Sequence, residues 1–522
     1  MRKLVTAGVV AVLMATALAA APTEAASRKT SATGIDFGRC DEAFLRKAHA
    51  RCGSLSVPLD YADPSGAQIQ LAVSRIMHTT PDADYQGVML VNPGGPGGSG
   101  LGLVTLGKYV PNHAGDAYDW IGFDPRGVGS SEPSLSCDPR YFKGNRPPYV
   151  PTTDQIETAW LQRSEAYANA CEDDAAALLP HMTTVDSARD MDSIRVALGA
   201  DQINYFGFSY GTYLGQVYAT LFPANVRRMV FDSTVDPRNV WYTANLNQDI
   251  AFEKVIRIWF GWVAKYDRVY HLGKTGWAVR TRFYAVERAL TRKPAGGVVG
   301  PDEWTDAFVL AAYGQSFWTY LGDVFSSWVR DRDVKKLIQA YRYADGPGND
   351  NIFAVYNAVQ CTDVQWPTSW DIWKQDNSTT YESAPFLTWD NVWYNAPCLY
   401  WAAPAGVPTV VNGGSTPVLM IDETLDAATP YEGSLEVRGL FPSASLIAEP
   451  GGTTHAGSLY GNACVDDKIA AFLATGALPP RVPGDEADTT CDPLPQPVPD
   501  AASRATRPER SMLARLGPVA RR

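Results

Sequence analysis

The chain has 522 residues, 45% of them hydrophobic, and a formal net charge of −11. This composition is typical of a globular protein that is long enough for one large domain with an insertion, or for two domains. Because the net charge is negative, there is no overall positive field to attract nucleic acid or an anionic membrane surface, and we set both partners aside.

Both ends of the chain differ in composition from the rest. Residues 1–26 resemble a secretory signal peptide, because Arg2 and Lys3 precede an apolar run at 4–21 that small residues follow. An uncleaved membrane anchor is the alternative, since about 18 apolar residues is the lower limit for spanning a bilayer, but this run is rich in alanine and only weakly hydrophobic. We expect a secreted protein without stable membrane association, and leave open whether it stays with the cell wall. The Pro- and Arg-rich tail, 492–522, is expected to be disordered.

Eight cysteines are spread over the chain, and their pattern favours disulfides over a metal site. Their number is even, no C-x-x-C pair occurs and no histidines cluster near them, so no metal is expected. Disulfides persist in the oxidising compartments that exported proteins reach. We expect sequential pairing: Cys40 with Cys52, Cys137 with Cys171, Cys361 with Cys398, and Cys464 with Cys491.

The first part of the chain alternates between strand-like and helix-like segments. A strand is predicted at 69–76, where apolar and polar residues alternate. Further strands are predicted where apolar runs end in glycine-rich or polar loops, at 87–91, 118–123, 203–208 and 227–233. Helices are expected at 184–199 and 210–222. This alternation predicts an α/β fold, with a mostly parallel sheet and helices on both faces.

The alternation stops near residue 236. From 237 to 411 the sequence is aromatic and helix-like and holds 13 of the 15 tryptophans, and strand-like runs return only at 417–422 and 444–450. We therefore expect an inserted, mainly helical cap at 237–411 between two parts of one sheet domain, 35–236 and 412–491. A separate C-terminal domain from about 237 is the alternative, but it does not account for the two later strand units.

The stretch "NYFGFSYGTYLGQVYATLF" contains Ser209 between Gly207 and Gly211, where an expected strand meets an expected helix. A G-x-S-x-G match alone is weak evidence. At this junction it predicts a nucleophile elbow, because a tight turn holds the serine out of the sheet and the glycines avoid collisions with neighbouring backbone. Ser209 is therefore the candidate nucleophile.

A serine nucleophile needs a histidine base that a carboxylate orients. Of the six histidines only His455 follows the last expected strand, in "EPGGTTHAGSLYG". The loop after the strand at 417–422 offers Asp426, which gives the order Ser, Asp, His of this architecture. Asp422, at the strand end, is the alternative. The hydroxyl of Thr429 is available to orient Asp426 or His455, or Thr429 simply precedes the proline that starts the next helix.

Backbone amides are expected to stabilise the oxyanion of the tetrahedral intermediate. One is the amide of Tyr210, and the other comes from the loop "NPGGPGG", with Gly95 preferred and Gly94 as the alternative. Such a loop also suits a phosphate, but the lysine and serine of a Walker motif are missing. No organic cofactor is indicated.

Several motifs together resemble one known family. The stretches "NPGGPGGSG", "GFDPRGVGSS", "FGFSYGTYLG", "DAATPYEG" and the late histidine are similar to the secreted tripeptidyl aminopeptidases of actinobacteria, relatives of the prolyl aminopeptidases in the α/β-hydrolase superfamily. The resemblance runs from about Cys40 to Cys491. It implies an α/β-hydrolase fold with Ser209 as nucleophile, Asp426 as acid and His455 as base, and the release of short peptides, typically tripeptides, from free N-termini. The stretch "THAG" departs from relatives that often have glycine around the histidine, which bears on the geometry of that loop.

An exopeptidase also has to bind the ammonium group of its substrate, usually with a carboxylate. The cap offers Asp249 and Glu253 in "NQDIAFEKV" and Asp363 in "QCTDVQW", beside a cysteine that would anchor it. Glu253 is preferred because it resembles cap glutamates of prolyl aminopeptidases. The alternative is that each is an ordinary solvated helix charge.

The sequence therefore predicts a secreted serine exopeptidase that acts on peptides or proteins through an acyl-enzyme. An esterase or lipase on the same triad is an alternative, because fold and triad do not determine which acyl group is attacked. A prolyl aminopeptidase is another. The last alternative is a non-catalytic binding protein with this fold. The presence of all the triad and elbow residues argues against this alternative.

Overall fold

The computed structural model describes residues 34–346 and 348–499, and the expected signal peptide at 1–26 lies outside them. No helix in these ranges is both long and apolar enough to cross a membrane. The centre of the protein is a ten-stranded sheet. In chain order its strands are β1 (Gly38–Arg39), β2 (Arg51–Pro58), β3 (Gln68–Ile76), β4 (Val88–Asn92), β5 (Asp119–Phe123), β6 (Ile203–Phe208), β7 (Val226–Asp232), β8 (Val418–Glu423), β9 (Ala444–Glu449) and β10 (Thr489–Thr490).

Most of the sheet is parallel, as predicted. The strand order is β1-β2-β3-β5-β4-β6-β7-β8-β9-β10. All neighbours from β5 to β10 are parallel, whereas β1, β2, β3 and β5 pair antiparallel at one edge. Every predicted strand forms within one residue of its expected bounds. β1, β2 and β10 were not predicted; β1 and β10 are only two residues long, and β2 buries only Leu55 and Val57, so it lacks a sustained apolar pattern.

Helices cover both faces of the sheet. In β4, Met89 and Val91 belong to one hydrophobic cluster and Val88 and Leu90 to another, as the two-residue period of a strand requires. The second cluster includes α3 (Thr184–Ala197), α4 (Tyr210–Leu221) and α14 (Glu432–Leu440). The first includes α15 (Ala463–Thr475) and the short helices α1 (Ala43–Lys47) and η2 (Leu101–Tyr109).

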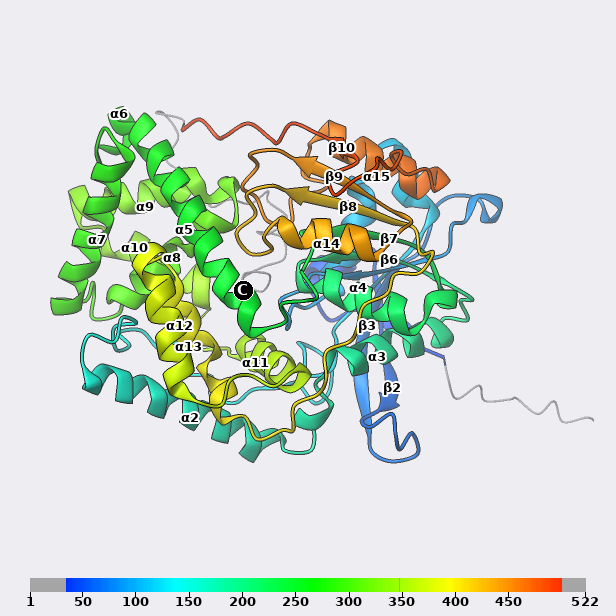
Figure 1. Cartoon of the computed structure of the whole chain (residues 1–522). Coiled ribbons are helices and arrows are strands. Elements are labelled where there is room, and N and C mark those ends of the chain that lie inside the picture. The colour runs from blue at the N-terminus through cyan, green and yellow to red at the C-terminus, as the bar shows by residue number, and fades with distance from the viewer. Residues whose placement is uncertain (1–33, 347, 500–522) are drawn as a thin grey trace, which may run out of the picture.

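Between β7 and β8 the chain forms a helical cap beside the sheet (Figure 1). Its interior is aromatic: the ring centroids of Phe283, Trp304 and Phe308 lie 4.5 to 5.4 Å apart. The aromatic composition of this region therefore builds the core of the cap. The cap helices are α5 (Tyr242–Lys265), α6 (Asp267–Tyr270), α7 (Gly276–Arg292), α8 (Pro301–Tyr313), α9 (Trp318–Asp331), α10 (Val334–Asp345), α11 (Asn351–Asp363), α12 (Trp370–Ser383) and α13 (Thr388–Asn395).

A helix from the first sheet segment also packs on the cap. α2 (Asp154–Ala175) lies below α12 and α13 in the view of Figure 1. Trp160 of α2 stacks on Trp393 of α13 with ring centroids 5.6 Å apart, and Trp393 Nε1 donates to Tyr149 O at 2.7 Å. The expected core part 35–236 therefore contributes to the cap, which composition alone did not indicate.

The cysteines form the four expected sequential disulfides: Cys40–Cys52, Cys137–Cys171, Cys361–Cys398 and Cys464–Cys491. Beyond Cys491 the chain follows the cap. Gln315 Nε2 donates to Leu494 O and Trp262 Nε1 to Pro497 O, each at 2.9 Å. These bonds correct the expectation of disorder for residues 492–499, because backbone carbonyls of that segment bind cap side chains.

Candidate active site

Ser209 lies at the sharp turn between β6 and α4, where its flanking glycines predicted it. Its backbone has φ 55° and ψ −128°, a conformation that costs a residue with a side chain about 1–3 kcal/mol. Hydrogen bonds from Ser209 N to Asp232 O (3.0 Å) and from Thr212 Oγ1 to Ser209 O (2.7 Å) hold the turn. The turn keeps Ser209 at the strand end, where it lines a pocket.

Glycines let the loop after β4 approach this turn. A Cβ on Gly94 would lie 2.4 Å from Phe208 O and 2.9 Å from Ser209 Cβ. A Cβ on Gly211 would lie 2.8 Å from Asn92 O. Both positions therefore exclude a larger side chain, because the clashing atoms are mostly backbone.

His455 and Asp426 form a buried pair, each only 2% exposed. They follow β9 and β8, and His455 Nδ1 lies 2.8 Å from Asp426 Oδ2. The amides of Ala428 and Thr429 donate to Asp426 Oδ1 at 2.9 and 3.2 Å, and Thr429 Oγ1 donates to Oδ2 at 2.9 Å. These bonds hold the carboxylate in one orientation. A proton on Nδ1 is then directed to Asp426, which leaves Nε2 to accept another proton.

Asp422, the alternative acid, has a different partner. Its carboxylate accepts hydrogen bonds from N and Oγ1 of Thr234 at 2.7 and 3.1 Å. Burial raises the pKa of Asp422 well above its ordinary value. The geometry therefore favours Asp426 over Asp422 as the partner of His455.

A pocket of about 380 Å³ lies between the sheet edge and the cap. Its core side includes Gly95, Ser209, Tyr210, Asp426 and Thr429. Its cap side comes largely from α5 and α11 and includes Trp241, Asn245, Gln248, Ala251, Tyr356 and Gln360. The candidate nucleophile, the candidate acid and the candidate oxyanion donors therefore share one cavity.

The two glycines considered for the oxyanion site differ in their contacts. The amide of Gly94 donates to Asn92 Oδ1 at 2.9 Å. Gly95, with φ 113°, lines the pocket together with Tyr210, the first residue of α4. This arrangement favours Gly95 over Gly94 as the second donor.

Glu253, the preferred candidate for binding the substrate ammonium group, does not line the pocket. It forms an ion pair with Arg257, lies 3.6 Å from Arg280 and accepts a hydrogen bond from Phe386 N at 3.0 Å. Asp249 is also buried elsewhere, where Asn391 Nδ2 donates to it at 3.1 Å. Neither carboxylate therefore reaches the candidate nucleophile.

Asp363 joins the cap to the core instead of lining the pocket. It accepts hydrogen bonds from N and Oγ1 of Thr184 at 2.7 Å each and from Trp241 Nε1 at 3.1 Å. Burial raises the pKa of Asp363 to about 6. Thr184 Oγ1 also lies 2.8 Å from Tyr210 Oη. Asp363 thus supports the residue that follows Ser209, and its carboxylate is already satisfied by these donors.

Two other carboxylates line the pocket besides Asp426. Asp236 pairs with Arg238 at 2.7 Å and accepts a hydrogen bond from Asn239 at 2.9 Å. Glu432 is exposed and begins α14. No role was predicted for Glu432, although it lies within the motif "DAATPYEG", six residues after Asp426.

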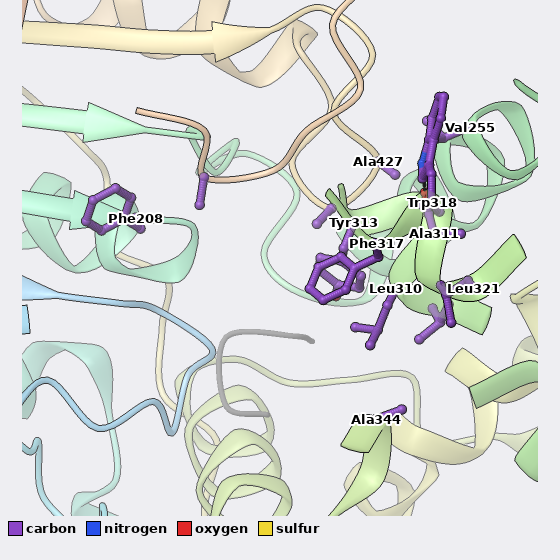
Figure 2. Close-up of a cluster of buried hydrophobic side chains, with 14 of the residues drawn as sticks. Phe208, Val255, Leu310, Ala311, Tyr313, Phe317, Trp318, Leu321, Ala344 and Ala427 are labelled. Atoms are coloured by element: carbon purple, nitrogen blue, oxygen red, sulfur yellow. Dashed lines mark hydrogen bonds between the residues drawn. The ribbon is translucent and has the colours of Figure 1, made fainter. Parts of the chain in front are cut away.

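Cap residues contact the loops that carry the acid and the base. Gln248 Nε2 of α5 donates to Ala428 O at 2.6 Å, and the amide of His455 donates to Tyr313 O at 2.8 Å. Figure 2 shows Phe208 and Ala427, the chain neighbours of Ser209 and Asp426, in the same hydrophobic cluster as Tyr313. Gln248 and Tyr313 were not predicted, because no local pattern in either stretch indicates a partner in a distant part of the chain.

Two buried glutamates lie next to the loop that carries His455. Glu423 and Glu449 are register partners on β8 and β9. Thr454 N donates to Glu423, and Asn462 Nδ2 donates to Glu449 at 2.6 Å. Burial, with a smaller effect from Glu449, raises the pKa of Glu423 well above its ordinary value, and burial raises the pKa of Glu449 to about 7.

Serine hydrolases of the α/β-hydrolase class carry the nucleophile on an elbow after one parallel strand and the acid and base after later strands. This chain has the same arrangement. Residues 87–275 match the family model described as alpha/beta hydrolase fold, and residues 384–491 match the model described as TAP-like protein. The chain belongs to the TAP-like family of α/β-hydrolase enzymes.

Curated relatives extend over most of the chain. A protein of Streptomyces coelicolor named tripeptidyl aminopeptidase is 42% identical over 91% of this chain and 89% of its own length. Serine protease Hip1 of Mycobacterium tuberculosis is 30% identical over 83% of this chain and 86% of its own length. Carboxylesterase B of Mycobacterium tuberculosis is 31% identical over 83% of this chain and 85% of its own length.

Proposed function

We propose that this protein is a secreted serine exopeptidase that releases tripeptides from the free N-termini of peptides and proteins. The observation that carries the proposal is the pocket shared by strained Ser209 and by Asp426, whose carboxylate is bonded to His455. Family membership and the relative named tripeptidyl aminopeptidase support the choice of a peptide bond over other acyl groups.

The proposed mechanism uses groups of the chain itself. Ser209 Oγ attacks the scissile carbonyl while His455 Nε2 takes its proton, and Asp426 stabilises the imidazolium through Nδ1. The amides of Gly95 and Tyr210 donate to the oxyanion. His455 then gives the proton to the leaving amine, and a water molecule that loses a proton to His455 hydrolyses the acyl-enzyme.

We assign recognition of the substrate ammonium group to Glu432. Glu253 and Asp363 are held by other donors away from the pocket, and Asp236 is paired with Arg238. Glu432 is exposed on the pocket wall. A carboxylate at a set position from the nucleophile measures a peptide of defined length, because an extended chain spans about 3.3–3.6 Å per residue.

Secretion is supported by the signal-like pattern of residues 1–26 and by the four disulfides, which persist in oxidising compartments. Whether the exported protein stays with the cell wall is tested by fractionating culture medium and washed cells.

The central experiment compares a tripeptide p-nitroanilide with a free N-terminus, the same compound N-acetylated, and a p-nitrophenyl ester. Wild type is expected to cleave the free anilide, and Ser209→Ala is expected to abolish that cleavage. Equal cleavage of free and acetylated anilides would refute the exopeptidase proposal. Cleavage of the ester alone would favour an esterase, the activity named for the carboxylesterase relative.

The role of Glu432 is tested by Glu432→Gln. We expect a KM for the free tripeptide anilide up to about fivefold higher than in wild type, because the substrate ammonium loses an exposed charged partner and an exposed ion pair contributes up to about 1 kcal/mol. Glu436→Gln is the matched control: Glu436 also lies on α14, but it pairs with Arg238 at 3.0 Å and is not part of the pocket wall. Equal KM values in the two variants would remove Glu432 from this role.

A further inference from the structure

A second groove, of about 570 Å³, adjoins the pocket that holds Ser209. The two cavities share Arg238, Asn239 and Trp241, so they adjoin at the segment that leads from β7 into α5. Neither the triad residues nor the candidate oxyanion donors line this groove.

Three segments that are distant in the sequence build the groove. Residues 238–243 form the side it shares with the pocket, residues 364–367 follow α11, and residues 406–408 return toward β8. Gly406 N donates to Thr362 O at 2.7 Å, which fixes the returning segment to the end of α11. The groove is therefore a product of the tertiary fold.

The walls of the groove are largely apolar, yet it is open to solvent. Val407 and Pro408 are exposed and contribute apolar surface, whereas Trp241 and Trp366 line the groove but are only 4% and 2% exposed. Val407 is 87% exposed, and Arg238, Thr243 and Gln365 are exposed as well. Apolar side chains held in water at the mouth of an active site are a common feature of surfaces that bind a partner chain.

We propose that this groove binds the part of the polypeptide substrate on the leaving side of the cleaved bond. The inference rests on the proposed exopeptidase function. The pocket holds a short N-terminal piece of fixed length between core and cap, whereas the rest of the substrate has no fixed length and needs an open path. The groove supplies this path, because it adjoins the pocket and its wall residues Arg238, Thr243 and Val407 are exposed to solvent.

The chemical class that fits the groove is an extended polypeptide with apolar side chains directly after the cleaved bond. The exposed surfaces of Val407 and Pro408 bury such side chains favourably. The polar groups of Asn239, Thr243 and Gln365 are available to its backbone. Substrates with only a small leaving group do not reach the groove and gain nothing from it.

Val407→Asp tests this assignment, with Val410→Asp as the matched control. Val410 is 88% exposed on the same segment but is not part of the groove wall. Each enzyme is assayed with a tripeptide p-nitroanilide and with two longer peptides that begin with the same three residues. One continues with leucine and phenylalanine and the other with serine and glycine.

We expect Val407→Asp to lower kcat/KM for the apolar longer peptide about tenfold, with the anilide and the Val410→Asp enzyme little changed. Activity on the anilide also reports that the variant is folded. If Val407→Asp leaves kcat/KM for the apolar longer peptide unchanged, or lowers it equally for that peptide and the anilide, the groove assignment is overturned. The exopeptidase proposal is then left intact. Failure of the wild type to cleave the free anilide would instead refute the proposed function and the groove assignment that depends on it.

Discussion

The backbone amide of His455 donates a hydrogen bond to the carbonyl of Tyr313, at 2.8 Å. Tyr313 is the last residue of α8, so the cap holds the backbone of the candidate base directly. The rings of the two residues also meet edge to face, with centroids 5.7 Å apart. The cap therefore acts on the geometry of the site as well as covering it.

A second contact between the cap and a catalytic loop, from Gln248 to Ala428, can be tested by mutation. Gln248→Leu removes the hydrogen bond to Ala428 O and loosens the loop that orients Asp426. We expect kcat to fall about tenfold with a smaller change in KM, because misorientation acts on the transition state more than on substrate binding. Asn247→Ala, the adjacent residue on the pocket wall, is the control. A larger effect in the control would assign the loss to substrate contacts.

Because the backbone at Ser209 is strained, we expect Ser209→Gly to be inactive and yet more stable than Ser209→Ala. Ser209→Gly and Ser209→Ala both remove the nucleophile and are expected to lower kcat by about 10⁴-fold or more. The glycine variant is expected to be about 1 kcal/mol more stable than the alanine variant, because glycine accepts φ 55° without strain. Urea unfolding of both variants gives this difference. A glycine variant that is less stable than the alanine variant would contradict the prediction.

Thr429 is predicted to orient the carboxylate of Asp426. Thr429→Val keeps the shape of the side chain and removes the hydroxyl that donates to Oδ2. We expect kcat/KM to fall about tenfold, as is typical when a buried bond to a charged group is lost. Thr429→Ser retains the hydroxyl and is expected to recover most of the activity. If serine and valine variants lose activity equally, the methyl group and not the hydroxyl is what matters.

The Glu423–Glu449 pair predicts how stability depends on pH. The pKa of Glu449 is raised to about 7 in the folded protein, against about 4.3 in an unfolded chain. Between these values the unfolded state releases a proton that the folded state keeps, so stability falls as pH rises from about 4 to 7.

Glu449→Gln removes this titration. Between pH 5 and pH 8 the free energy of unfolding of wild type is expected to fall by about 1–3 kcal/mol more than that of the variant. Urea unfolding at both pH values measures the two changes. Glu436→Gln, at a half-buried position of α14, is the control for loss of one negative charge. A wild type whose stability rises over this range relative to Glu449→Gln would contradict the assigned direction of the pKa.

The sequence by itself determined the features that depend on local pattern. Apolar runs marked β4 to β9 to within one residue, because a strand buried in a parallel sheet needs nearly every side chain to be apolar. The alternation of apolar and polar residues marked β3, which is antiparallel to both its neighbours. The glycines around Ser209 marked the elbow because backbone contact there leaves no space for a Cβ. The order of Ser209, Asp426 and His455 followed from the order of the strands that precede them.

The tertiary structure alone decided which side chains meet across the cap. Glu253 and Asp363 have the residue type that an ammonium site needs, but packing turns one toward Arg257 and the other toward Thr184. Gln248, Glu432 and Val407 carry no distinctive local pattern, and their neighbours come from distant parts of the chain. Helical period and composition report that a segment is buried, whereas the partner that buries it is set by how separate segments pack together.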